Sequence, residues 1–311
     1  MSFTAEVKDE LTRVVPTCSH CEKATLAALA RIDGALYISG LGRYRLEIDT
    51  EISSVARLII RLLHTIYQLK TELTVRRSVL HKTPNYLITV PMQKGLEEAL
   101  HDLGIMDAKG LEMGIEDSLV EKNCCAAAYL RGAFLGSGFI SDPRGDFHFE
   151  ITVESEDQAQ DLVDLMEDKG IKARVLPRRN SYTVYLKSGT AISEFLAYTG
   201  AYQSALKMEN ERVRKSVRND INRKVNAEVA NQAKSAEAAI DQIVSIKKLV
   251  NSGKVSQLSP GLQEFIRLRL QNPEASLKEL GEKANPPLSK SAVYHRVRRI
   301  EELARSVSDQ Q

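Results

Sequence analysis

The sequence lacks any run of about 18 uncharged apolar residues, the length that a helix needs to cross a bilayer. Its most apolar stretch, residues 52–67, carries Arg57, Arg61 and His64 at helical spacing, which predicts an amphipathic helix. The N-terminal MSFTAEVKDEL is charged and has no apolar core, so it does not resemble a secretion signal. Four cysteines in 311 residues are too few for a disulfide framework. These absences favour a reduced, cytoplasmic protein without membrane contacts.

Signatures of common enzymes are also absent. The six histidines are scattered along the chain and form no arrangement of nucleophile and base. Gly132, Gly136 and Gly138 are not followed by the Lys-Ser/Thr pair of a phosphate-binding loop, and they are expected on a helix-packing surface. The sequence therefore gives no indication of a kinase, an NTPase or a bound cofactor.

The composition is that of a globular protein, with 43% hydrophobic and 27% charged residues, and the length predicts two or three domains. The net charge is only +2, but it is unevenly distributed. Residues 207–311 hold 20 Lys+Arg and 13 Asp+Glu, a net charge of +7, which leaves −5 for residues 1–206. The last third of the chain is therefore the part that suits a polyanion, although solvated basic helices are a common alternative.

The first two thirds contain a repeat that follows an N-terminal arm, residues 1–22. Its two halves span residues 23–105 and 120–204, and both are predicted as helix, strand, helix, two strands, helix. Residues 44–51, YRLEIDTE, align with residues 147–154, FHFEITVE, with strand alternation and glutamates in the same places. Two such α/β copies are expected to pack about a pseudo-two-fold axis.

The predicted elements of the two halves can be compared one by one. Glycine closes several of the helices, as expected for a left-handed C-terminal residue. The first half has helices at 24–35, 52–68 and 93–103 and strands at 44–49, 72–77 and 85–90. The second half has helices at 125–135, 156–168 and 191–198 and strands at 147–152, 172–176 and 182–186.

Residues 205–255 are predicted to be a basic helical linker that breaks at the sequence NSGK, residues 251–254. Asparagine is a mediocre helix former, so its recurrence here favours hydrogen bonds to phosphates or to a partner, with a solvated face as the alternative. The candidate contact residues are Arg212, Arg214, Lys215, Arg218, Asn222, Arg223, Asn226, Asn231 and Lys234.

Residues 256–308 have the organisation of a helix-turn-helix domain. Ser259-Pro260 starts one helix, a capping box at Ser276-Leu-Lys-Glu279 starts a short second one, and Asn285-Pro-Pro-Leu288 forms the turn. Ser289 then caps the last helix, and the order of elements resembles region 4 of primary sigma factors. A three-helix protein-binding or structural unit is the alternative.

The last helix is predicted to have two distinct faces. Val293, Val297, Ile300 and Ala304 form an apolar stripe that would pack on the domain, while the opposite polar face would enter the major groove. The candidate DNA-binding residues of the domain are Ser276, Lys278, Ser289, Lys290, Ser291, Tyr294, His295, Arg296, Arg298 and Arg299.

The first helix of each half resembles the LAGLIDADG motif of homing endonucleases. The sequences are LAALARIDG at residues 26–34 and LRGAFLGSG at residues 130–138. The resemblance implies two motif helices packed together through small residues, halves of α-β-β-α-β-β-α order, and a saddle over DNA. In that family the last acidic residue of each motif holds the catalytic metals, but here Asp33 occupies one position and Ser137 the other. Two-metal hydrolysis needs both carboxylates, so the resemblance implies the fold and argues against the activity.

A degenerate LAGLIDADG repeat followed by a helix-turn-helix resembles the WhiA family of sporulation and cell-division regulators of Gram-positive bacteria. The most specific pieces are Ala133-Phe-Leu135 with Gly138, the run Arg212 to Lys234, and Ser276 through Lys290. The resemblance implies sequence-specific binding of double-stranded DNA in transcriptional control of division, sporulation and chromosome segregation. In actinobacterial members it implies a WhiB-type iron–sulfur protein and RNA polymerase holoenzyme as partners.

The four cysteines form two pairs, Cys18 with Cys21 and Cys124 with Cys125. Each pair precedes a motif helix, so the pairs become neighbours if the halves pack as expected, and a four-cysteine zinc site is conceivable. Adjacent cysteines rarely chelate one ion well and a second CxxC is missing, so buried free thiols and no metal are the default expectation.

We therefore expect an α+β, two-fold pseudo-symmetric LAGLIDADG-type domain, catalytically inactive, followed by an all-α helix-turn-helix domain. Two alternatives remain. One is a working metal-dependent nuclease that uses Asp33 with a second carboxylate such as Glu47 or Glu150. The other is a protein-binding adaptor whose terminal helices dock on RNA polymerase.

Overall fold

The computed structural model describes the chain except for residues 1, 41–42, 78–83, 108–109, 113 and 309–311. It contains two compact units, residues 1–215 and 216–311. Within the described ranges, no helix combines the length and the apolar character that a membrane crossing requires. Each unit has its own hydrophobic core, so each is described separately.

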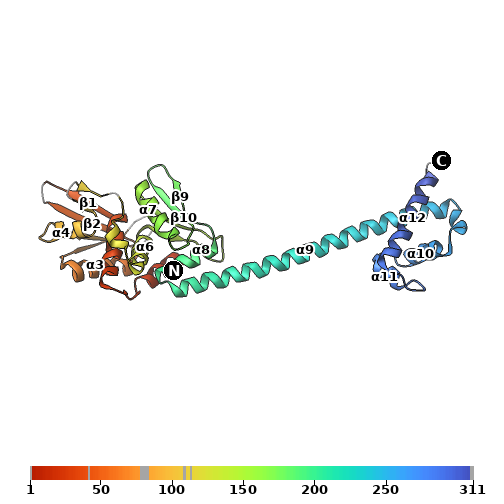
Figure 1. Ribbon diagram of the computed structural model, residues 1–311, viewed down its shortest axis with the longest axis horizontal. Coiled ribbons are helices and arrows are strands. Elements are labelled where there is room, and N and C mark those ends of the chain that lie inside the picture. Colours follow the sequence, from red (N-terminus) through yellow and green to blue (C-terminus); the bar gives the residue numbers. More distant parts are fainter. Residues whose placement is uncertain (1, 41–42, 78–83, 108–109, 113, 309–311) are drawn as a thin grey trace. The chain divides into compact units, whose positions relative to one another are not determined.

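The first unit is built from two copies of one α-β-β-α-β-β-α pattern. Both four-stranded sheets are antiparallel and have matching orders, β1-β2-β4-β3 and β7-β8-β10-β9, and Figure 1 shows each sheet with its own helices. The first copy comprises α2 (Ser19–Ile32), β1 (Gly34–Ile38), β2 (Tyr44–Thr50), α3 (Ser53–Tyr67), β3 (Glu72–Arg77), β4 (Pro84–Val90) and α4 (Leu96–Asp102). The second comprises α6 (Asn123–Ser137), β7 (Phe139–Ile140), β8 (Phe149–Val153), α7 (Glu156–Glu167), β9 (Arg174–Pro177), β10 (Tyr182–Leu186) and α8 (Gly189–Thr199).

The periodicity of the sequence missed the first strand of each copy, β1 and β7, although the order implied by the LAGLIDADG resemblance includes both. It extended the first helix to residue 35, but α2 ends at Ile32 and the chain passes directly into β1. A Cβ at Gly34 would lie 1.9 Å from the carbonyl oxygen of Ala30, and one at the equivalent Gly138 would lie 2.4 Å from that of Phe134. Glycine therefore allows an abrupt change from helix to strand at the same place in both copies. The expected repeat is confirmed, in the order that the resemblance implies and with one more strand per half than the periodicity predicts.

The two motif helices, α2 and α6, pack closely against each other at the centre of this unit. A Cβ on Gly132 would lie 2.4 Å from the carbonyl oxygen of Thr25, so the absence of a side chain permits the close approach. The Thr25 hydroxyl donates a hydrogen bond across the interface to the carbonyl oxygen of Ala128, at 3.1 Å. The predicted role in packing is confirmed for Gly132 and for Gly136, where a Cβ would lie 3.2 Å from the Ile32 side chain. It is wrong for Gly138, which caps α6 and where a Cβ would meet Phe134 of the same helix.

The first residues, expected to be an arm, form helix α1 (Phe3–Leu11), in which Val7 and Leu11 are buried in the core. The Thr4 hydroxyl donates to the carbonyl oxygen of Ile140 at 2.8 Å. The Glu10 carboxylate accepts hydrogen bonds from the backbone amides of Gln203 and Ser204, at 2.7 and 3.0 Å. Because those amides lie in the first turn of α9 (Tyr202–Asn251), Glu10 caps that helix. Between the copies lie the short α5 (Asp117–Val120) and the hairpin of β5 (Met106–Asp107) and β6 (Gly110–Leu111).

The second unit is helical. After α9 come a 3-10 turn, η1 (Lys254–Gln257), and the helices α10 (Pro260–Gln271), α11 (Leu277–Glu282) and α12 (Lys290–Ser308). The predicted break after residue 251 is confirmed, because Gly253 adopts a left-handed conformation with φ +69°. The predicted starts of the three helices of the domain, at Ser259-Pro260, Ser276 and Ser289, are confirmed.

Candidate nucleic-acid interface

The core of the second unit fixes which face of α12 is exposed. Val293, Val297, Ile300 and Ala304 are all buried against Phe265 of α10 and its neighbours, as the sequence predicted. Ile246 and Leu249, from the end of α9, belong to the same core. The domain therefore includes the last turns of the long helix.

The turn between α11 and α12 is held by local hydrogen bonds. The predicted capping box is present: the Ser276 hydroxyl accepts from the Glu279 amide, and the Glu279 carboxylate accepts from the Ser276 amide. The Leu288 amide donates to the carbonyl oxygen of Gly281 at 2.9 Å. A Cβ on Gly281 would lie 2.3 Å from the Leu288 carbonyl oxygen, so glycine lets the turn fold back onto α11. These contacts fix where α12 begins.

The opposite face of α12 is polar and solvent-exposed. The side chains that line it stand on the first half of the helix, the part that a helix-turn-helix domain inserts into the major groove. They combine guanidinium, imidazole, phenol and hydroxyl groups, which can donate to base edges and phosphates. The exposed members are Lys290, Ser291, Tyr294, His295, Arg298 and Arg299, with Lys278 exposed on α11.

Exposed Lys278 and Arg299 pair with Glu282 and Glu302 of their own helices, at 3.9 and 3.1 Å. Three further predicted DNA-binding residues have structural contacts. Arg296 is half-buried, and its guanidinium forms an ion pair with Glu264 of α10 at 3.0 Å. The Ser276 hydroxyl caps α11, and the Ser289 hydroxyl accepts from the Ala292 amide at 3.2 Å and caps α12. Arg296 therefore ties α12 to α10, and a contact with DNA from these three residues stays a prediction.

Arg269 is a structural residue that the sequence did not single out. Its side chain is 1% exposed, and its guanidinium donates to the carbonyl oxygens of Pro273 and Ala275, at 3.3 and 2.5 Å. Burial lowers the pKa of this guanidinium. Arg269 thus joins the end of α10 to the loop before α11. One arginine in a basic amphipathic helix carries no sequence signal of burial.

The predicted contact residues of the linker all lie on α9, and several already have partners in the first unit or along the helix. Arg212 and Arg214 form ion pairs with Glu209 and Glu211, both at 2.7 Å. Arg223 pairs with Asp220 at 2.5 Å. Exposed ion pairs of this kind contribute at most about 1 kcal/mol, so a polyanion could compete for the arginines.

Lys215 differs from the arginines of α9. Its ammonium donates to the carbonyl oxygen of Gly145 and lies 4.0 Å from the centre of the Phe147 ring. Phe147 lies two residues before β8 in the second copy, so Lys215 holds the start of α9 to that copy. The other members of the predicted set, Arg218, Asn222, Asn226, Asn231 and Lys234, are exposed.

The two motif acid positions lie at the ends of α2 and α6. Asp33 is the C-terminal cap residue of α2, and its carboxylate oxygen lies 3.2 Å from where a Cβ of Gly136 would be. Ser137 is used by the sheet, since its hydroxyl donates to the carbonyl oxygen of Thr152 at 2.5 Å and accepts from the Thr152 amide at 3.1 Å. The second position therefore supplies a structural hydroxyl group.

A buried lysine interacts electrostatically with Asp33. Lys8 of α1 is buried, and its Nζ donates to the carbonyl oxygen of Gly136 at 2.5 Å. Its charge interacts with those of Asp33 and Glu51. Of the glutamates suggested for a nuclease, Glu47 pairs with Arg45 at 3.4 Å and Glu150 with His148 at 3.1 Å. Lys8 thus places a positive charge of the protein near the motif ends, where homing endonucleases hold metal ions.

The Asp33 site predicts a pH dependence of stability. Burial raises the pKa of Asp33 to about 7, against the opposing charge of Lys8. Between about pH 4 and about pH 7 the folded chain keeps a proton that the unfolded chain has lost, so stability falls as pH rises through this window. Burial lowers the pKa of Lys8 to about 8, so its own contribution rises between about pH 8 and about pH 10.

We expect Asp33→Asn to remove the decrease in stability between about pH 4 and about pH 7. Relative to this variant, the free energy of unfolding of the unaltered protein should drop by on the order of 2 kcal/mol from about pH 5 to about pH 7.5. Urea unfolding of both proteins at the two pH values measures the difference. Parallel pH profiles would show that Asp33 titrates normally.

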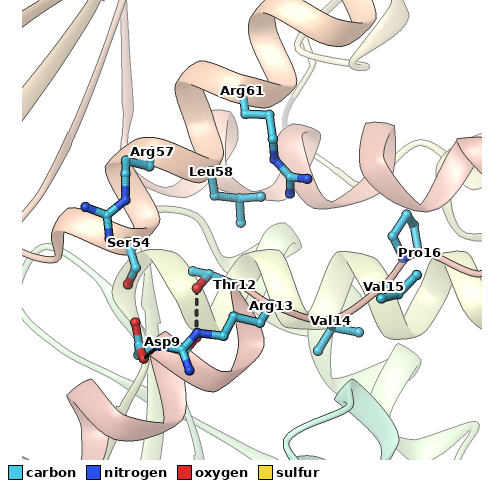
Figure 2. Close-up of a pocket in the computed structure, with 10 residues that line it drawn as sticks. All are labelled: Asp9, Thr12, Arg13, Val14, Val15, Pro16, Ser54, Arg57, Leu58 and Arg61. Atoms are coloured by element: carbon cyan, nitrogen blue, oxygen red, sulfur yellow. Dashed lines mark hydrogen bonds and ion pairs between the residues drawn. The ribbon is translucent and has the colours of Figure 1, made fainter.

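The ten-residue pocket in Figure 2 lies between the end of α1 and α3 and has a volume of about 490 Å³. Arg13, Arg57 and Arg61 give it a basic lining. The Arg13 guanidinium forms an ion pair with Asp9, four residues earlier. The sequence predicts that Arg57 and Arg61 lie on the polar face of an amphipathic helix, and α3 confirms this prediction.

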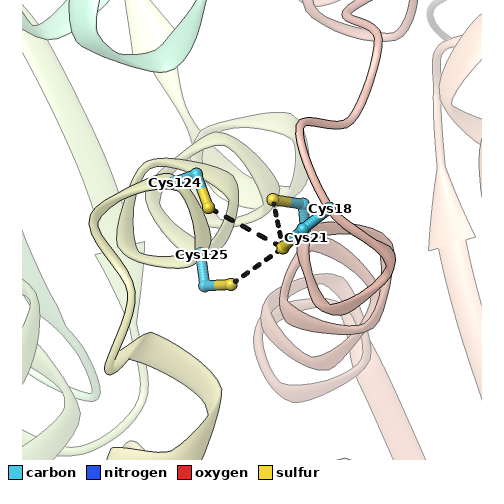
Figure 3. Close-up of side chains that lie close together, drawn as sticks. All are labelled: Cys18, Cys21, Cys124 and Cys125. Carbon is cyan, nitrogen blue, oxygen red and sulfur yellow. Dashed lines mark hydrogen bonds between the residues drawn. The ribbon is translucent and has the colours of Figure 1, made fainter.

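The structure brings the two cysteine pairs together. Cys18, Cys21, Cys124 and Cys125 point toward one another from the starts of α2 and α6 (Figure 3). Their four sulfur atoms all lie within 4.8 Å of one another. The sequence predicts that the two cysteine pairs become neighbours if the two halves pack together, and the structure confirms this prediction.

The fold and the site define a class of protein: a LAGLIDADG-like α+β domain followed by a helical region with a helix-turn-helix domain. Residues 19–106 match the WhiA N-terminal LAGLIDADG-like domain, residues 126–218 the WhiA LAGLIDADG-like domain, and residues 221–304 the WhiA C-terminal HTH domain. The chain belongs to the WhiA family.

Relatives and a solved structure agree with this membership over the full length. A "Probable cell division protein WhiA" of Desulforamulus reducens is 45% identical over 98% of this chain and 95% of its own length. A protein of the same name from Heliobacterium modesticaldum is 42% identical over 100% of this chain and 98% of its own. The crystal structure of full-length DUF199/WhiA from Thermatoga maritima superposes with a TM-score of 0.61 at 25% identity, covering 98% of this chain and 99% of that one.

Proposed function

We propose that this protein is a sequence-specific DNA-binding transcriptional regulator that acts in cell division, sporulation or chromosome segregation, and that it is not an enzyme. The observation that carries the proposal is the division of α12 into a buried apolar stripe and an exposed basic face. The match of residues 221–304 to a helix-turn-helix domain and the names of the relatives support it. Such a protein would act in the cytoplasm, at the nucleoid.

In this proposal, α12 reads base edges and α9 provides secondary contacts. Exposed apolar side chains at Val213, Val217, Ile221, Val225 and Val229 accompany the basic residues of α9. A surface of both kinds suits a protein partner as well as phosphates. For such a partner the family resemblance suggests a WhiB-type iron–sulfur protein and RNA polymerase holoenzyme.

The absence of nuclease activity is proposed from the motif ends. Divalent metals are held by clustered carboxylates, and here Ser137 is bonded to β8. The Lys8 ammonium is bonded to the Gly136 carbonyl oxygen and interacts with the charge of Asp33. An ammonium at this place repels a metal ion, and a pKa of about 7 leaves Asp33 partly protonated near neutral pH. Asp33 then acts as the partner of a buried lysine rather than as a catalytic ligand.

One gel tests both parts of the proposal. Supercoiled plasmids carrying genomic fragments would be incubated with the full-length protein, with and without magnesium, and scored for retardation and for nicking. We expect retarded, uncut DNA in both conditions, with affinity falling steeply as salt rises. Nicking that needs magnesium and disappears in Asp33→Ala would show that the protein is an enzyme.

A further inference from the structure

All four cysteines of the chain meet at one point. Cys18 precedes the first turn of α2 and Cys21 lies within it, whereas Cys124 and Cys125 lie in the first turn of α6. The two pairs are separated by about a hundred residues of sequence, and the packing of α2 on α6 brings them together (Figure 3). None of the four is in a disulfide.

We propose that these four thiolates bind one Zn²⁺ ion, in a structural site that clamps the two motif helices together. In a tetrahedral site with zinc–sulfur bonds of about 2.3 Å, the sulfur atoms lie about 3.8 Å apart. The Cys18 sulfur lies 3.4 Å from that of Cys21 and 3.7 Å from those of Cys124 and Cys125. The remaining sulfur pairs lie within 4.8 Å of one another, so shifts of at most about 1 Å would produce the ideal geometry.

The backbone explains why adjacent cysteines can serve here. Cys18 has an extended conformation, with φ −147° and ψ 165°, which turns its side chain back over the first turn of α2. Cys124 and Cys125 occupy the second and third positions of α6, and both sulfurs reach the Cys18 sulfur. Cys21 and Cys125 are buried, while Cys18 and Cys124 are half-buried, so an ion has a route of entry.

The electrostatic surroundings favour a negatively charged centre. A zinc ion with four thiolates carries a net charge of −2. Both cysteine pairs lie at helix N-termini, where the backbone amides stabilise negative charge. Arg131 borders one cavity together with Cys21 and another, of about 720 Å³, together with Cys124.

The chemistry points to a structural role for the metal. Four protein ligands leave no open position, which is typical of structural zinc and unlike catalytic zinc. The site lies at the N-terminal ends of α2 and α6, while Asp33 and Lys8 lie near their C-terminal ends. The two helices would thus be joined by a metal at one end, while at the other end Lys8 bonds to Gly136 of α6 and interacts with the charge of Asp33.

Metal analysis of the full-length, tag-free protein tests the proposal. We expect about one zinc per chain after exhaustive dialysis, and at least about five-fold less in Cys18→Ser and in Cys124→Ser. Serine is a favoured N-cap residue, so Cys18→Ser should preserve the start of α2. His20→Ala is the matched control and should keep its zinc, because the imidazole, although inside the CxxC sequence, is outside the four-atom cluster.

X-ray absorption at the zinc edge provides a measurement on the unaltered protein. Four sulfur neighbours at about 2.3 Å would support the assignment. A folded, reduced protein that contains no zinc and retains none after incubation with Zn²⁺ would overturn it, as would iron in place of zinc. Equal zinc content in the cysteine variants and His20→Ala would also overturn it.

Discussion

Replacing both Arg298 and Arg299 by alanine is expected to weaken binding to a specific DNA site by about 100-fold or more. Each side chain lies on the exposed face of α12, and a bidentate arginine contact to a guanine contributes about 1–3 kcal/mol. The apolar stripe of the helix is unchanged, so the domain should remain folded. Fluorescence anisotropy with a specific and a scrambled duplex, at one salt concentration, measures the loss.

The matched control for this experiment is Arg305→Ala. Arg305 is exposed on the same helix but in its last turn, so the variant removes a positive charge without altering the first half of α12. We expect at most a few-fold loss, and an equal one on both duplexes. If the double variant bound the specific duplex as tightly as Arg305→Ala does, the terminal helices would be better explained as a protein-docking unit.

The largest effect on stability is expected from Gly132→Ala. In an exposed helix this change would stabilise by about 1 kcal/mol, because glycine is a poor helix former. Here the new Cβ would lie 2.4 Å from the Thr25 carbonyl oxygen and 2.8 Å from the Ala28 Cβ. The motif helices must move apart, and such overpacking typically costs about 1–3 kcal/mol. Chemical denaturation measures the loss of stability in the first unit, and hydrogen exchange of the amides in α2 and α6 shows whether the loss is located at these helices.

Gly145→Ala is the control for the glycine experiment. A Cβ there would lie 3.5 Å from the nearest atom, the carbonyl oxygen of Asp142, which is ordinary van der Waals contact. We expect a change within about 0.5 kcal/mol. A Gly132→Ala protein as stable as Gly145→Ala would mean that α2 and α6 can separate at little cost.

The sequence predicted most of the fold because its periodicity is strong. The strands at 72–77 and 182–186 have the predicted bounds, and the stripe of α12 is buried as expected. The missed strands β1 and β7 are short and follow a helix without a loop. No turn residues therefore separate the periodicity of the helix from the alternation of the strand. Helix α1 was missed because its burial depends on segments far along the chain.

The candidate sites differ in how much of each could be predicted from the sequence. The exposed face of α12 could be predicted because it depends only on the apolar periodicity of one helix and on its capping residue. The neighbourhood of Asp33 did not, because Lys8 reaches the carbonyl oxygen of Gly136 through tertiary packing alone. The cysteine cluster was visible as two pairs, but only the approach of α2 to α6 determines that their sulfur atoms converge. The partner of Arg296, Glu264, likewise lies 32 residues away in sequence.

The contacts of α1 have a consequence for synthesis on the ribosome. This helix is made before the rest of its unit, yet its hydrogen-bond partners are Ile140, Gly136 and the start of α9 at Gln203 and Ser204. Local contacts can form as the chain grows, but the contacts with Gly136 and Ile140 join residues 128 and 136 positions apart, and those with α9 join residues 193 and 194 positions apart. The first copy of the repeat is therefore expected to fold during synthesis, and the closure of the whole unit by α1 to be one of the last steps.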